Sequence, residues 1–372
     1  MKKILIIHPA LAPYMVDQFN DLSQLYDLHV VFLFRNLRYD KFDQSKLLPL
    51  LKFKSSFLLK GLHYKERVFR FGILSTIRKI NPDIIIGYEY SFTTQYLLLL
   101  KKLGLIHQSI GSIIDDNIDI CHNVQSRIRF FARHISVRRL DYLIVLSKEV
   151  SQFYQNKFNL KENQVIINPL LQDTERLRKK RKELECIANE YTQKYHLKGK
   201  KVLLFVGRFV PVKGLTRFID TIKAILHEQE NIAFVLVGDG EEKGNIEVFL
   251  KDKKLEDKVL LPGRYEGTEL YAWYLCASGL VLPSTYEPFG AVVNESLIFG
   301  TKVFCSKYAG ASVLIQSETG MIFDPLDESE TIHDLNRFLN LINVVADINL
   351  ENKPTLMFNH QQNFVKEWNK LS

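Results

Sequence analysis

Short apolar runs alternate with segments of helical periodicity along the first half of the chain. Runs such as Lys3–Ile7 are continuous rather than alternating, which is typical of strands buried on both faces of a sheet. This order predicts a parallel sheet with helices on both sides. The predicted strands cover 3–7, 27–33, 83–86, 109–114, 141–146 and 164–167, and the predicted helices cover 15–25, 68–80, 94–103 and 127–139.

The same alternation starts again after Asn168-Pro169, which we interpret as a domain boundary. We therefore expect two Rossmann-like domains, 1–168 and 169–358, with a ligand cleft beyond the carboxyl ends of their strands. A charged segment, 173–182, comes first and is interpreted as a solvated helix face. Predicted strands follow at 201–206, 233–237, 259–261, 279–282 and 302–305, and a predicted helix covers 215–227.

The last segment, 359–372, has the apolar spacing of a short amphipathic helix. Its apolar side comprises Phe364, Val365, Trp368 and Leu371. We expect this helix either to pack back on the first domain or to close the second.

The composition is that of an ordinary soluble protein of two domains, with 372 residues, of which 46% are apolar and 25% charged. No apolar run reaches the roughly 18 residues that a membrane-spanning helix needs. The beginning, Met1–His8, is expected to be a first strand rather than a signal peptide. The four cysteines have no paired spacing, so we expect a cytoplasmic location without disulfides or a zinc site.

The positive charge of the chain is confined to its first half. Residues 1–168 hold 24 Lys/Arg and 14 Asp/Glu, a balance of +10, whereas residues 169–372 hold 26 and 28, a balance of −2. This bias either serves solubility or indicates an anionic partner of the first domain, such as a membrane surface or a lipid-linked substrate. No signature of a nucleic-acid-binding domain is present, so we expect no nucleic-acid partner.

The most informative motif is the segment 284–295, which carries two glutamates across a predicted loop-to-helix junction. Glu287 lies in the loop, Pro288 and Gly290 tighten the turn, and Glu295 is expected about two turns along the helix. The amides of the first helical turn have no partner within the helix, so they can bind an anion or a sugar hydroxyl. A nucleotide-sugar, with hydroxyls at both ends, fits carboxylates at two depths.

A second motif, 205–214, opens the second domain. The predicted strand ends at Gly207, where the missing Cβ permits close approach of another backbone. Arg208 and Lys213 stand on either side of the short loop that follows. Arg binds phosphate oxygens in a bidentate manner and Lys acts as a point charge, so the two suit a diphosphate. The alternative is that they are surface cations beside a turn.

Taken together, these motifs resemble those of the family 4 retaining glycosyltransferases (glycosyl transferases group 1). The resemblance covers residues 202–327 and rests on segments in the order and spacing of that family. It implies the GT-B fold, in which an acceptor-binding and a donor-binding Rossmann-like domain face each other across a cleft. The matching segments are 206–208 with 213–214, 237–240, 283–290 with Glu295, and 319–327.

The resemblance also implies roles for single residues. Arg208 and Lys213 would hold the diphosphate of the donor and stabilise it as the leaving group. Glu287 would lie beside the donor sugar, and Glu295 would bind the ribose hydroxyls.

Further contacts to the donor are implied in the same way. The main-chain amides of Phe289 and Gly290 would help to hold the sugar, and Gly238 would lie near the nucleotide base. Similar enzymes use no metal, because the two cations and the helix N-termini balance the phosphate charge. The chain carries no suitably placed Asp-X-Asp motif and no histidine spacing typical of a metal site. We therefore expect no cofactor beyond the UDP- or GDP-linked sugar donor.

The first domain departs from the family pattern. Its first strand is followed by 8–14 without the glycine-rich loop that many members carry. Asp115 stands where a catalytic contact to the donor sugar is expected, unless it is the N-cap of the next segment. Asp116 and Glu89, at neighbouring strand ends, are the alternatives. In the second domain, Val313 replaces an acidic residue that is usual in the family.

We expect a hexosyltransferase that moves a sugar from a nucleotide-diphosphate sugar to a hydroxyl with retention at the anomeric carbon. The expected acceptor is a lipid-linked saccharide in the synthesis of a bacterial capsule, O-antigen or exopolysaccharide. The basic run 52–70 is interleaved with apolar side chains, and we expect it to contact the inner face of the cell membrane. Those side chains are Phe53, Phe57, Leu58 and Leu59.

Other functions are kept as alternatives. A GT-B epimerase would act on the nucleotide-sugar itself without an acceptor, and a nucleotide-sugar-binding protein would show no turnover. A dinucleotide-dependent oxidoreductase is disfavoured, because the first strand is not followed by Gly-X-Gly-X-X-Gly.

Overall fold

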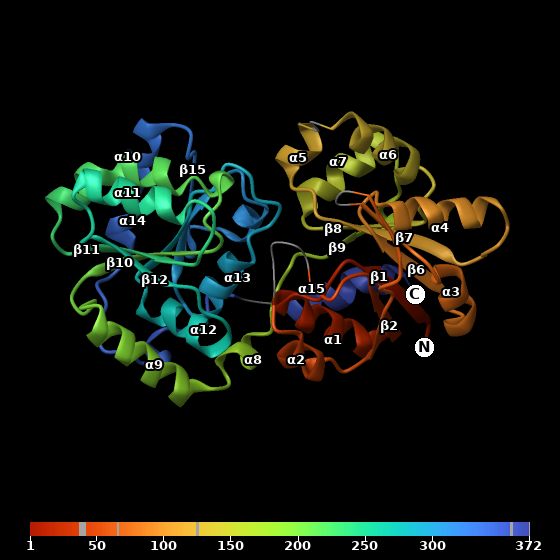
Figure 1. Ribbon diagram of the computed structural model, residues 1–372, viewed down its shortest axis with the longest axis horizontal. Helices are drawn as coiled ribbons and strands as arrows, with labels where there is room; N and C mark the ends of the chain where they lie inside the picture. The colour runs from red at the N-terminus through yellow and green to blue at the C-terminus, as the bar shows by residue number, and fades with distance from the viewer. Residues whose placement is uncertain (37–41, 65–66, 124–125, 358–359, 372) are drawn as a thin grey trace. The chain divides into compact units, whose positions relative to one another are not determined.

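The computed structural model of the protein describes residues 1–36, 42–64, 67–123, 126–357 and 360–371 (Figure 1). The chain divides into two compact units. Unit 1 comprises Met1–Gln172 together with Asn359–Ser372, and unit 2 comprises Asp173–Phe358. The first stretch of unit 1 thus ends after Gln172, close to the boundary that the sequence predicts after Asn168.

Unit 1 is built on a seven-stranded sheet of order β3-β2-β1-β6-β7-β8-β9, in which all neighbours are parallel. The strand order reverses between β1 and β6, and ligands of open α/β sheets bind beyond the carboxyl ends of strands at such a point. The strands are β1 (Lys3–His8), β2 (Asp27–Phe32), β3 (Lys54–Phe57), β6 (Ile84–Tyr88), β7 (Ser109–Ile114), β8 (Tyr142–Val145) and β9 (Val165–Ile167).

Helices cover both faces of this sheet, which explains the continuous apolar runs of its strands. In β1, Ile4 and Ile6 contribute to one buried cluster, and Leu5 and Ile7 contribute to the other. Helices α1 (Val16–Leu25) and α15 (His360–Trp368) border the first cluster. The second cluster is covered by α3 (Ile73–Ile80), α4 (Phe92–Lys102), α6 (Arg127–Val137) and α7 (Lys148–Phe158), and the short helices are α2 (Gln44–Leu47) and α5 (Ile118–His122).

The prediction of one helix over 68–80 is wrong for its first part. The chain forms an antiparallel hairpin there, and the helix α3 begins only at Ile73. Gly72 separates the two elements with a left-handed φ of 91°, a conformation that glycine adopts readily. The buried guanidinium of Arg70 donates to the Leu33 oxygen at 2.9 Å and thereby ties the hairpin to unit 1. The hairpin strands are β4 (Gly61–Tyr64) and β5 (Arg67–Arg70).

The phenylalanines of the basic run 52–70 are less exposed than the sequence suggests, whereas Leu59 is 40% exposed. Phe53 packs edge-to-face on Phe19 with ring centroids 5.9 Å apart, and Phe57 packs on Phe32. Both aromatic side chains belong to the border of the unit 1 core rather than to an outer apolar surface. Lys65, a member of the predicted run, lies outside the described residues.

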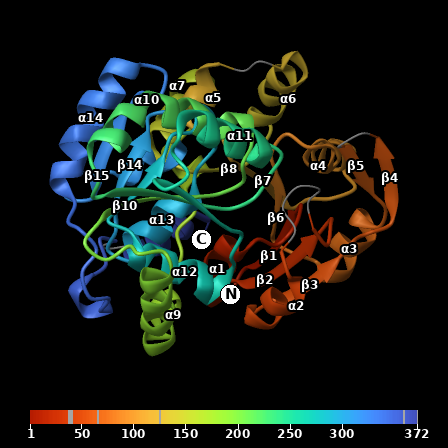
Figure 2. The same cartoon turned by 60° about the vertical axis from the view of Figure 1, so that its left-hand side comes forward.

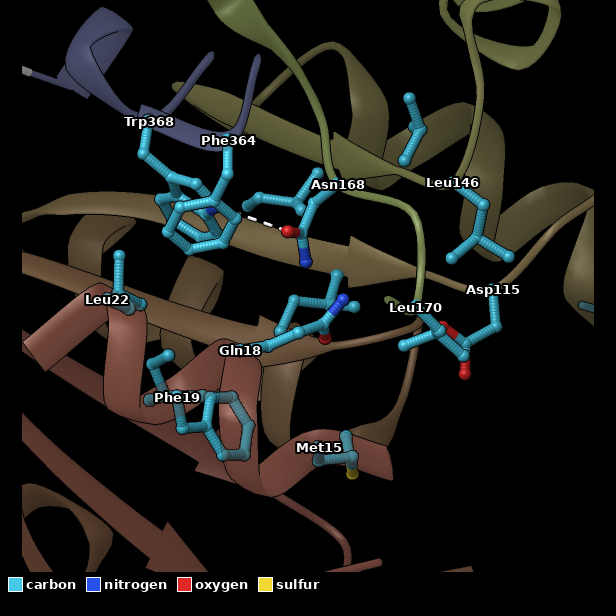
Figure 3. Close-up of a pocket in the computed structure, with 14 residues that line it drawn as sticks. Met15, Gln18, Phe19, Leu22, Asp115, Leu146, Asn168, Leu170, Phe364 and Trp368 are labelled. Atoms are coloured by element: carbon cyan, nitrogen blue, oxygen red, sulfur yellow. Dashed lines mark hydrogen bonds between the residues drawn. The ribbon is translucent and has the colours of Figure 1, made fainter. Parts of the chain in front are cut away.

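The C-terminal helix α15 packs on unit 1, the first of the two places that the sequence allows. Tyr26 donates its hydroxyl to the Trp368 main-chain oxygen at 2.7 Å, and the indole of Trp368 donates to Asn168 Oδ1 at 3.2 Å (Figure 3). Trp368 and Phe364 also close a small cavity of about 20 Å³, which is room for about one water molecule. Helix α15 thus completes the core on the α1 side of the sheet.

Unit 2 repeats the design with a six-stranded sheet of order β12-β11-β10-β13-β14-β15, again with parallel neighbours throughout. The two parallel, helix-covered sheets confirm the predicted α/β class with two Rossmann-like domains. The strands of unit 2 are β10 (Lys201–Val206), β11 (Ile232–Val237), β12 (Val259–Gly263), β13 (Gly279–Leu282), β14 (Lys302–Ser306) and β15 (Gly320–Phe323).

Several helices of unit 2 lie outside the sequence prediction. Helix α12, with its Trp273 fully buried, carries a mostly apolar sequence without clear amphipathic spacing, and it packs along α9. The helices are α8 (Thr174–Arg178), α9 (Arg181–Lys194), α10 (Leu215–Glu228), α11 (Lys243–Lys253), α12 (Gly267–Cys276), α13 (Ala291–Ile298) and α14 (Glu328–Leu341). Among the described residues of both units, no helix combines the length and the apolar character needed to cross a bilayer.

Candidate active site

The two motifs of unit 2 meet at the carboxyl edge of its sheet. Strands β10 and β13 are parallel neighbours, so the loops that follow them leave the same edge side by side. A main-chain hydrogen bond of 2.8 Å from the Thr285 nitrogen to the Val212 oxygen joins these loops. Gly214 allows the contact, because a Cβ there would come within 2.8 Å of the Pro283 oxygen and because its φ of 65° is left-handed.

Within this contact, Lys213 and Glu287 form an ion pair between Nζ and Oε2. Their side chains are only 17% and 13% exposed, so the pair is largely withdrawn from water. Exclusion from water strengthens the attraction between the two charges, and it raises the free-energy cost of leaving either charge unpaired. An ammonium carries three donors, so Lys213 can serve this carboxylate and a bound anion together.

Arg208 lies on the same loop, but its side chain is exposed. The next residue, Phe209, is fully buried, and its amide donates to the Asp239 oxygen at 2.9 Å. The anchored Phe209 fixes the backbone from which Arg208 projects. The loop therefore presents one exposed cation and one withdrawn cation.

Gly238 has a clear packing role at the end of β11. A Cβ on Gly238 would come within 1.9 Å of the Gly207 oxygen, and a Cβ on Gly240 would come within 2.4 Å of the Phe209 oxygen. The ends of β10 and β11 thus approach each other more closely than any larger residue permits. The predicted place of Gly238 near the nucleotide base stays a prediction.

Helix α13 begins at Ala291, directly after the loop that carries Glu287. Its N-cap is Gly290, with a left-handed φ of 98°. A Cβ on Gly290 would lie 2.9 Å from Leu282 Cδ2 and 3.3 Å from Glu287 Cγ, so glycine leaves room for the carboxylate side chain at the helix start. The positive end of the helix dipole and the amides that begin α13 therefore lie beside the ion pair.

The segment that follows β14 holds the loop 287–290 in place through two main-chain hydrogen bonds. The main-chain oxygens of Glu287 and Phe289 accept hydrogen bonds from the amides of Gly310 and Ala311 at 3.1 and 2.7 Å. The Phe289 ring is buried. These contacts fix the orientation of the backbone that the sequence analysis expects to hold a sugar.

Glu295 lies one turn inside α13 rather than two, because the helix begins at Ala291. Its side chain is buried, and its Oε2 accepts a hydrogen bond of 2.6 Å from the hydroxyl of Tyr274. Burial, reinforced by the negative charge of Glu295, raises the pKa of Tyr274 well above its usual range, so this hydroxyl stays protonated. Tyr274 therefore orients the Glu295 carboxylate.

Of the eight predicted site residues, seven lie in unit 2 and Asp115 lies in unit 1. Asp115 follows β7, and its Oδ2 accepts a hydrogen bond from the hydroxyl of Tyr88 at the end of β6. The N-cap of the next helix, α5, is Asn117, whose Oδ1 accepts from the Ile120 amide at 2.9 Å. The alternative that Asp115 serves as the N-cap is therefore wrong.

The other two carboxylates of unit 1, Glu89 and Asp116, share one guanidinium. Arg129 lies 2.7 Å from Glu89 Oε2 and 2.6 Å from Asp116 Oδ1. Glu89 also accepts the amide of Asp115 at 3.0 Å, and its φ of 53° is left-handed, which is uncommon for a residue with a side chain. Tyr154 donates to Asp116 Oδ2 at 2.6 Å. We call Glu89, Asp115, Asp116 and Arg129 the unit 1 charge cluster.

Burial dominates the electrostatics of this cluster. It raises the pKa of Glu89 to about 8, against the opposing effect of Arg129 and with support from Asp116. Burial also raises the pKa of Asp115. In Arg129, burial acts to lower the pKa, but Glu89 and Asp116 outweigh it and raise the value above its usual range. The guanidinium is therefore the fixed positive charge of the cluster, whereas burial favours the protonated form of Glu89 and Asp115.

Three residues at these sites, Arg129, Tyr274 and His8, are not indicated as site residues by the sequence. Arg129 and Tyr274 contact carboxylates that are 13 to 40 positions away in sequence, and no local pattern indicates such pairs.

His8, at the end of β1, is buried, and burial lowers its pKa to about 4. Its Nδ1 lies 3.0 Å from the Ala10 oxygen, and its Nε2 has no hydrogen-bond partner among the described residues. Within those residues, no group of His, Cys, Asp and Glu side chains is arranged to hold a metal ion.

Comparison with known families gives a match over much of unit 2. Residues 188–349 match the family model described as glycosyl transferases group 1. This range includes the Lys213–Glu287 pair and Glu295.

Characterised and uncharacterised proteins resemble the chain at low identity. An uncharacterized glycosyltransferase of Methanocaldococcus jannaschii, MJ1178, is 26% identical over 91% of this chain and 87% of its own. A Campylobacter jejuni N-acetylgalactosaminyltransferase, named for an undecaprenol-linked saccharide, is 27% identical over 80% of this chain and 76% of its own. The match to 2-deoxystreptamine N-acetyl-D-glucosaminyltransferase of Niallia circulans, at 26% identity, spans only 44% of this chain and 42% of that protein.

Solved structures share the whole architecture. HepE from Anabaena, in complex with UDP, aligns with a TM-score of 0.67 at 15% identity over 99% of both chains. The lipopolysaccharide outer core galactosyltransferase WaaB aligns with a TM-score of 0.65 at 16% identity over the full length of both. At these identities the likeness shows the fold, which is GT-B.

Proposed function

We propose that this chain, whose residues 188–349 match the glycosyl transferases group 1, moves a hexose from a nucleotide-diphosphate sugar to a hydroxyl acceptor with retention at the anomeric carbon. The observation that carries the proposal is the Lys213–Glu287 pair at the N-terminus of α13. A largely buried cation, a carboxylate and the N-terminal end of a helix lie together there, at one edge of a parallel sheet. HepE, which shares this fold, has been solved in complex with UDP and with UDP-glucose, which supports a nucleotide-sugar donor.

In this proposal the donor lies across the loops after β10 and β13. Arg208 and Lys213 bind the two phosphates, and Lys213 shares its donors between the phosphate and Glu287. The carboxylate of Glu287 accepts hydroxyls of the sugar, and Glu295 accepts hydroxyls of the ribose. The Tyr274 hydroxyl already orients the Glu295 carboxylate, so this side chain needs little reorganisation when the donor binds.

The proposed reaction breaks the bond between the anomeric carbon and the phosphate oxygen and forms a bond from the same face to the acceptor oxygen. The acceptor proton passes to the departing phosphate, and the nucleoside diphosphate leaves. Arg208 and Lys213 offset the negative charge that develops on the leaving group. Glu287 already pairs with Lys213, which suits a binding role rather than that of a covalent nucleophile.

We further propose that the acceptor is a lipid-linked saccharide of a bacterial surface polysaccharide, bound by unit 1. The name of the Campylobacter relative, which includes an undecaprenol-linked saccharide, supports this class. Asp115 is the proposed unit 1 contact to the reacting sugar, and the unit 1 charge cluster holds its main-chain amide in place.

The test uses the purified full chain. UDP- and GDP-linked sugars are screened by thermal shift, because a ligand of the native state raises its stability. The hit is then incubated with a saccharide acceptor, and the anomeric configuration of the product is read by NMR, with and without EDTA. Retention with unchanged rate in EDTA supports the proposal. An inverted product, or loss of transfer in EDTA, contradicts it, and isomerised donor without acceptor indicates the epimerase instead.

Replacing Glu295 by glutamine is expected to weaken donor binding by about 10- to 100-fold. The reason is that the two hydrogen bonds from ribose hydroxyls lose a charged acceptor, and hydrogen bonds to charged groups are worth about 1.5–3 kcal/mol. Isothermal titration with the donor measures the effect. Exposed Glu256→Gln serves as the matched control, and unchanged affinity in Glu295→Gln would exclude a donor contact.

A further inference from the structure

Helix α6 turns its largest apolar side chains to solvent. Ile128, Phe131 and Ile135 are 61%, 62% and 47% exposed. Their spacing of three and four positions places them on one face of the helix. Phe130 is 40% exposed and packs edge-to-face on Phe131 with ring centroids 5.8 Å apart. The helix therefore presents a row of bulky side chains that the fold does not cover.

The residues that α6 buries are Arg133, Ser136 and Val137, two of which are polar. Arg133 donates to the Cys121 oxygen at 3.1 Å, and Ser136 accepts from the Gln95 amide of α4 at 2.7 Å. Polar contacts thus hold much of the helix in place, and its apolar face takes no part in the core. Contiguous exposed apolar surface of this kind is typical of an interaction site.

Helix α4 extends the same surface. It lies next to α6 in both views of the molecule (Figures 1 and 2). Phe92, Leu99 and the C-cap Leu103 are 46%, 49% and 62% exposed, and their spacing of seven and four positions again defines one helix face. We call the exposed apolar side chains of α4 and α6 the docking face. It comprises Phe92, Leu99, Leu103, Ile128, Phe130, Phe131 and Ile135.

The charges within α6 and next to its two ends are of one sign, and Asp141, just beyond the C-terminal end, pairs with Lys101 of α4 at 2.6 Å. Between Asp119 and Asp141 the chain carries no acidic residue and five arginines. Arg127, Arg138 and Arg139 are exposed at the two ends of α6. Lys102, at the end of α4, is exposed as well. Bulky apolar side chains rimmed by arginine are typical of surfaces that lie in the headgroup region of an anionic bilayer.

We propose that the docking face binds unit 1 to the surface of an anionic lipid bilayer. Phe131 and Ile128 enter the boundary between headgroups and acyl chains, and Arg127, Arg138 and Arg139 contact the lipid phosphates. The predicted contact through the basic run 52–70 stays a prediction, and the docking face exposes larger apolar side chains than that run, whose Phe53 and Phe57 pack on the core.

A second copy of the chain fits the docking face less well than a bilayer. A two-fold contact places the same patch on both sides, so the arginine rims of the two copies would oppose each other. A bilayer of phosphatidylglycerol offers negative charge to the same rim. Charge complementarity therefore favours the lipid surface.

The docking face is independent of the proposed sugar transfer, because none of its residues belongs to the donor site of unit 2. A binding assay without donor or acceptor therefore tests it separately. If transfer to a soluble acceptor is found and vesicle binding is not, only the bilayer proposal fails.

The test is flotation of the full chain with vesicles. The wild type is expected to float with vesicles of phosphatidylglycerol and phosphatidylcholine at low salt, and to float less at high salt or with phosphatidylcholine alone. The variant Ile128→Asp/Phe131→Asp is expected to lose at least about tenfold in partition, because both apolar insertions are replaced by repelled charges. The control Val248→Asp/Ile332→Asp alters exposed apolar residues of α11 and α14 by the same charge and should float like the wild type.

A second variant keeps the proposal testable if the double aspartate variant unfolds. Trp273 and Trp368 are both buried, so Phe131→Trp adds an exposed reporter whose emission is expected to shift to the blue with anionic vesicles, whereas Val248→Trp should not shift. Absence of wild-type flotation, equal flotation of the double aspartate variant, or an unshifted Phe131→Trp emission overturns the proposal. Sedimentation that shows a dimer lost in Ile128→Asp/Phe131→Asp would assign the face to a second copy instead, and would equally overturn it.

Discussion

Replacing Lys213 by methionine is expected to lower the rate of sugar transfer by about 10²- to 10³-fold. Methionine keeps the length of the side chain and removes its charge. The lysine is withdrawn from water beside Glu287, where a positive charge stabilises a developing negative charge more than it would in solvent. A loss of this size is typical when one preorganised hydrogen-bond donor that stabilises the developing negative charge is removed. Steady-state kinetics with the donor identified by thermal shift measures it.

Two further variants separate catalysis from folding. Lys251→Met removes an exposed lysine of α11 and should transfer at the wild-type rate. Lys213→Met leaves Glu287 without its cation, so part of its defect could come from a displaced loop. Lys213→Met/Glu287→Gln removes that charge, and it should regain thermal stability without regaining transfer. A wild-type kcat in the Lys213→Met variant would refute the role of Lys213 in the reaction.

Replacing Arg129 by methionine is expected to destabilise unit 1 by about 2–3 kcal/mol. The substitution leaves Glu89 and Asp116 close together, with side chains 16% and 0% exposed and no guanidinium between them. Breaking a buried ion pair costs about 3–5 kcal/mol, and the 35% exposure of the Arg129 side chain lowers this value. Urea unfolding followed by circular dichroism measures the change. Exposed Arg138→Met is the matched control and should change stability little.

The destabilisation should depend on pH with a defined sign. In the folded protein the pKa of Glu89 is raised to about 8, whereas in the unfolded chain it is near 4.5. Between these values the folded state binds the extra proton, so stability falls as pH rises through this window. Without Arg129 the folded pKa rises further, and the variant should lose more stability at about pH 8 than at about pH 6. Arg129→Met/Glu89→Gln should remove most of that difference, and a deficit independent of pH would contradict this account.

Much of the architecture follows from local pattern. The strands 109–114, 201–206 and 279–282 have the predicted bounds, because buried parallel strands are continuous apolar runs with polar residues at their ends. Prediction was wrong at 68–70, where the second strand of a hairpin replaces the start of a helix. Short apolar stretches with Val and Phe suit both structures, and the strand is accompanied by contacts that are distant in sequence, such as those of Arg70 with the Leu33 oxygen and of Phe69 with Tyr96.

Local pattern is enough to predict two parallel α/β units and to locate Lys213 and Glu287 on two glycine-bearing loops of the second unit. Both conclusions depend on neighbours in sequence, where periodicity and turn residues act. The pairing of polar side chains depends on the tertiary structure: Lys213 and Glu287 form an ion pair, Arg129 pairs with Glu89 and Asp116, and the neutral Tyr274 hydroxyl donates to Glu295. The tertiary structure also decided that α6 turns its phenylalanines outward. These contacts join residues far apart in the chain, and their energies arise from burial, which no local pattern records.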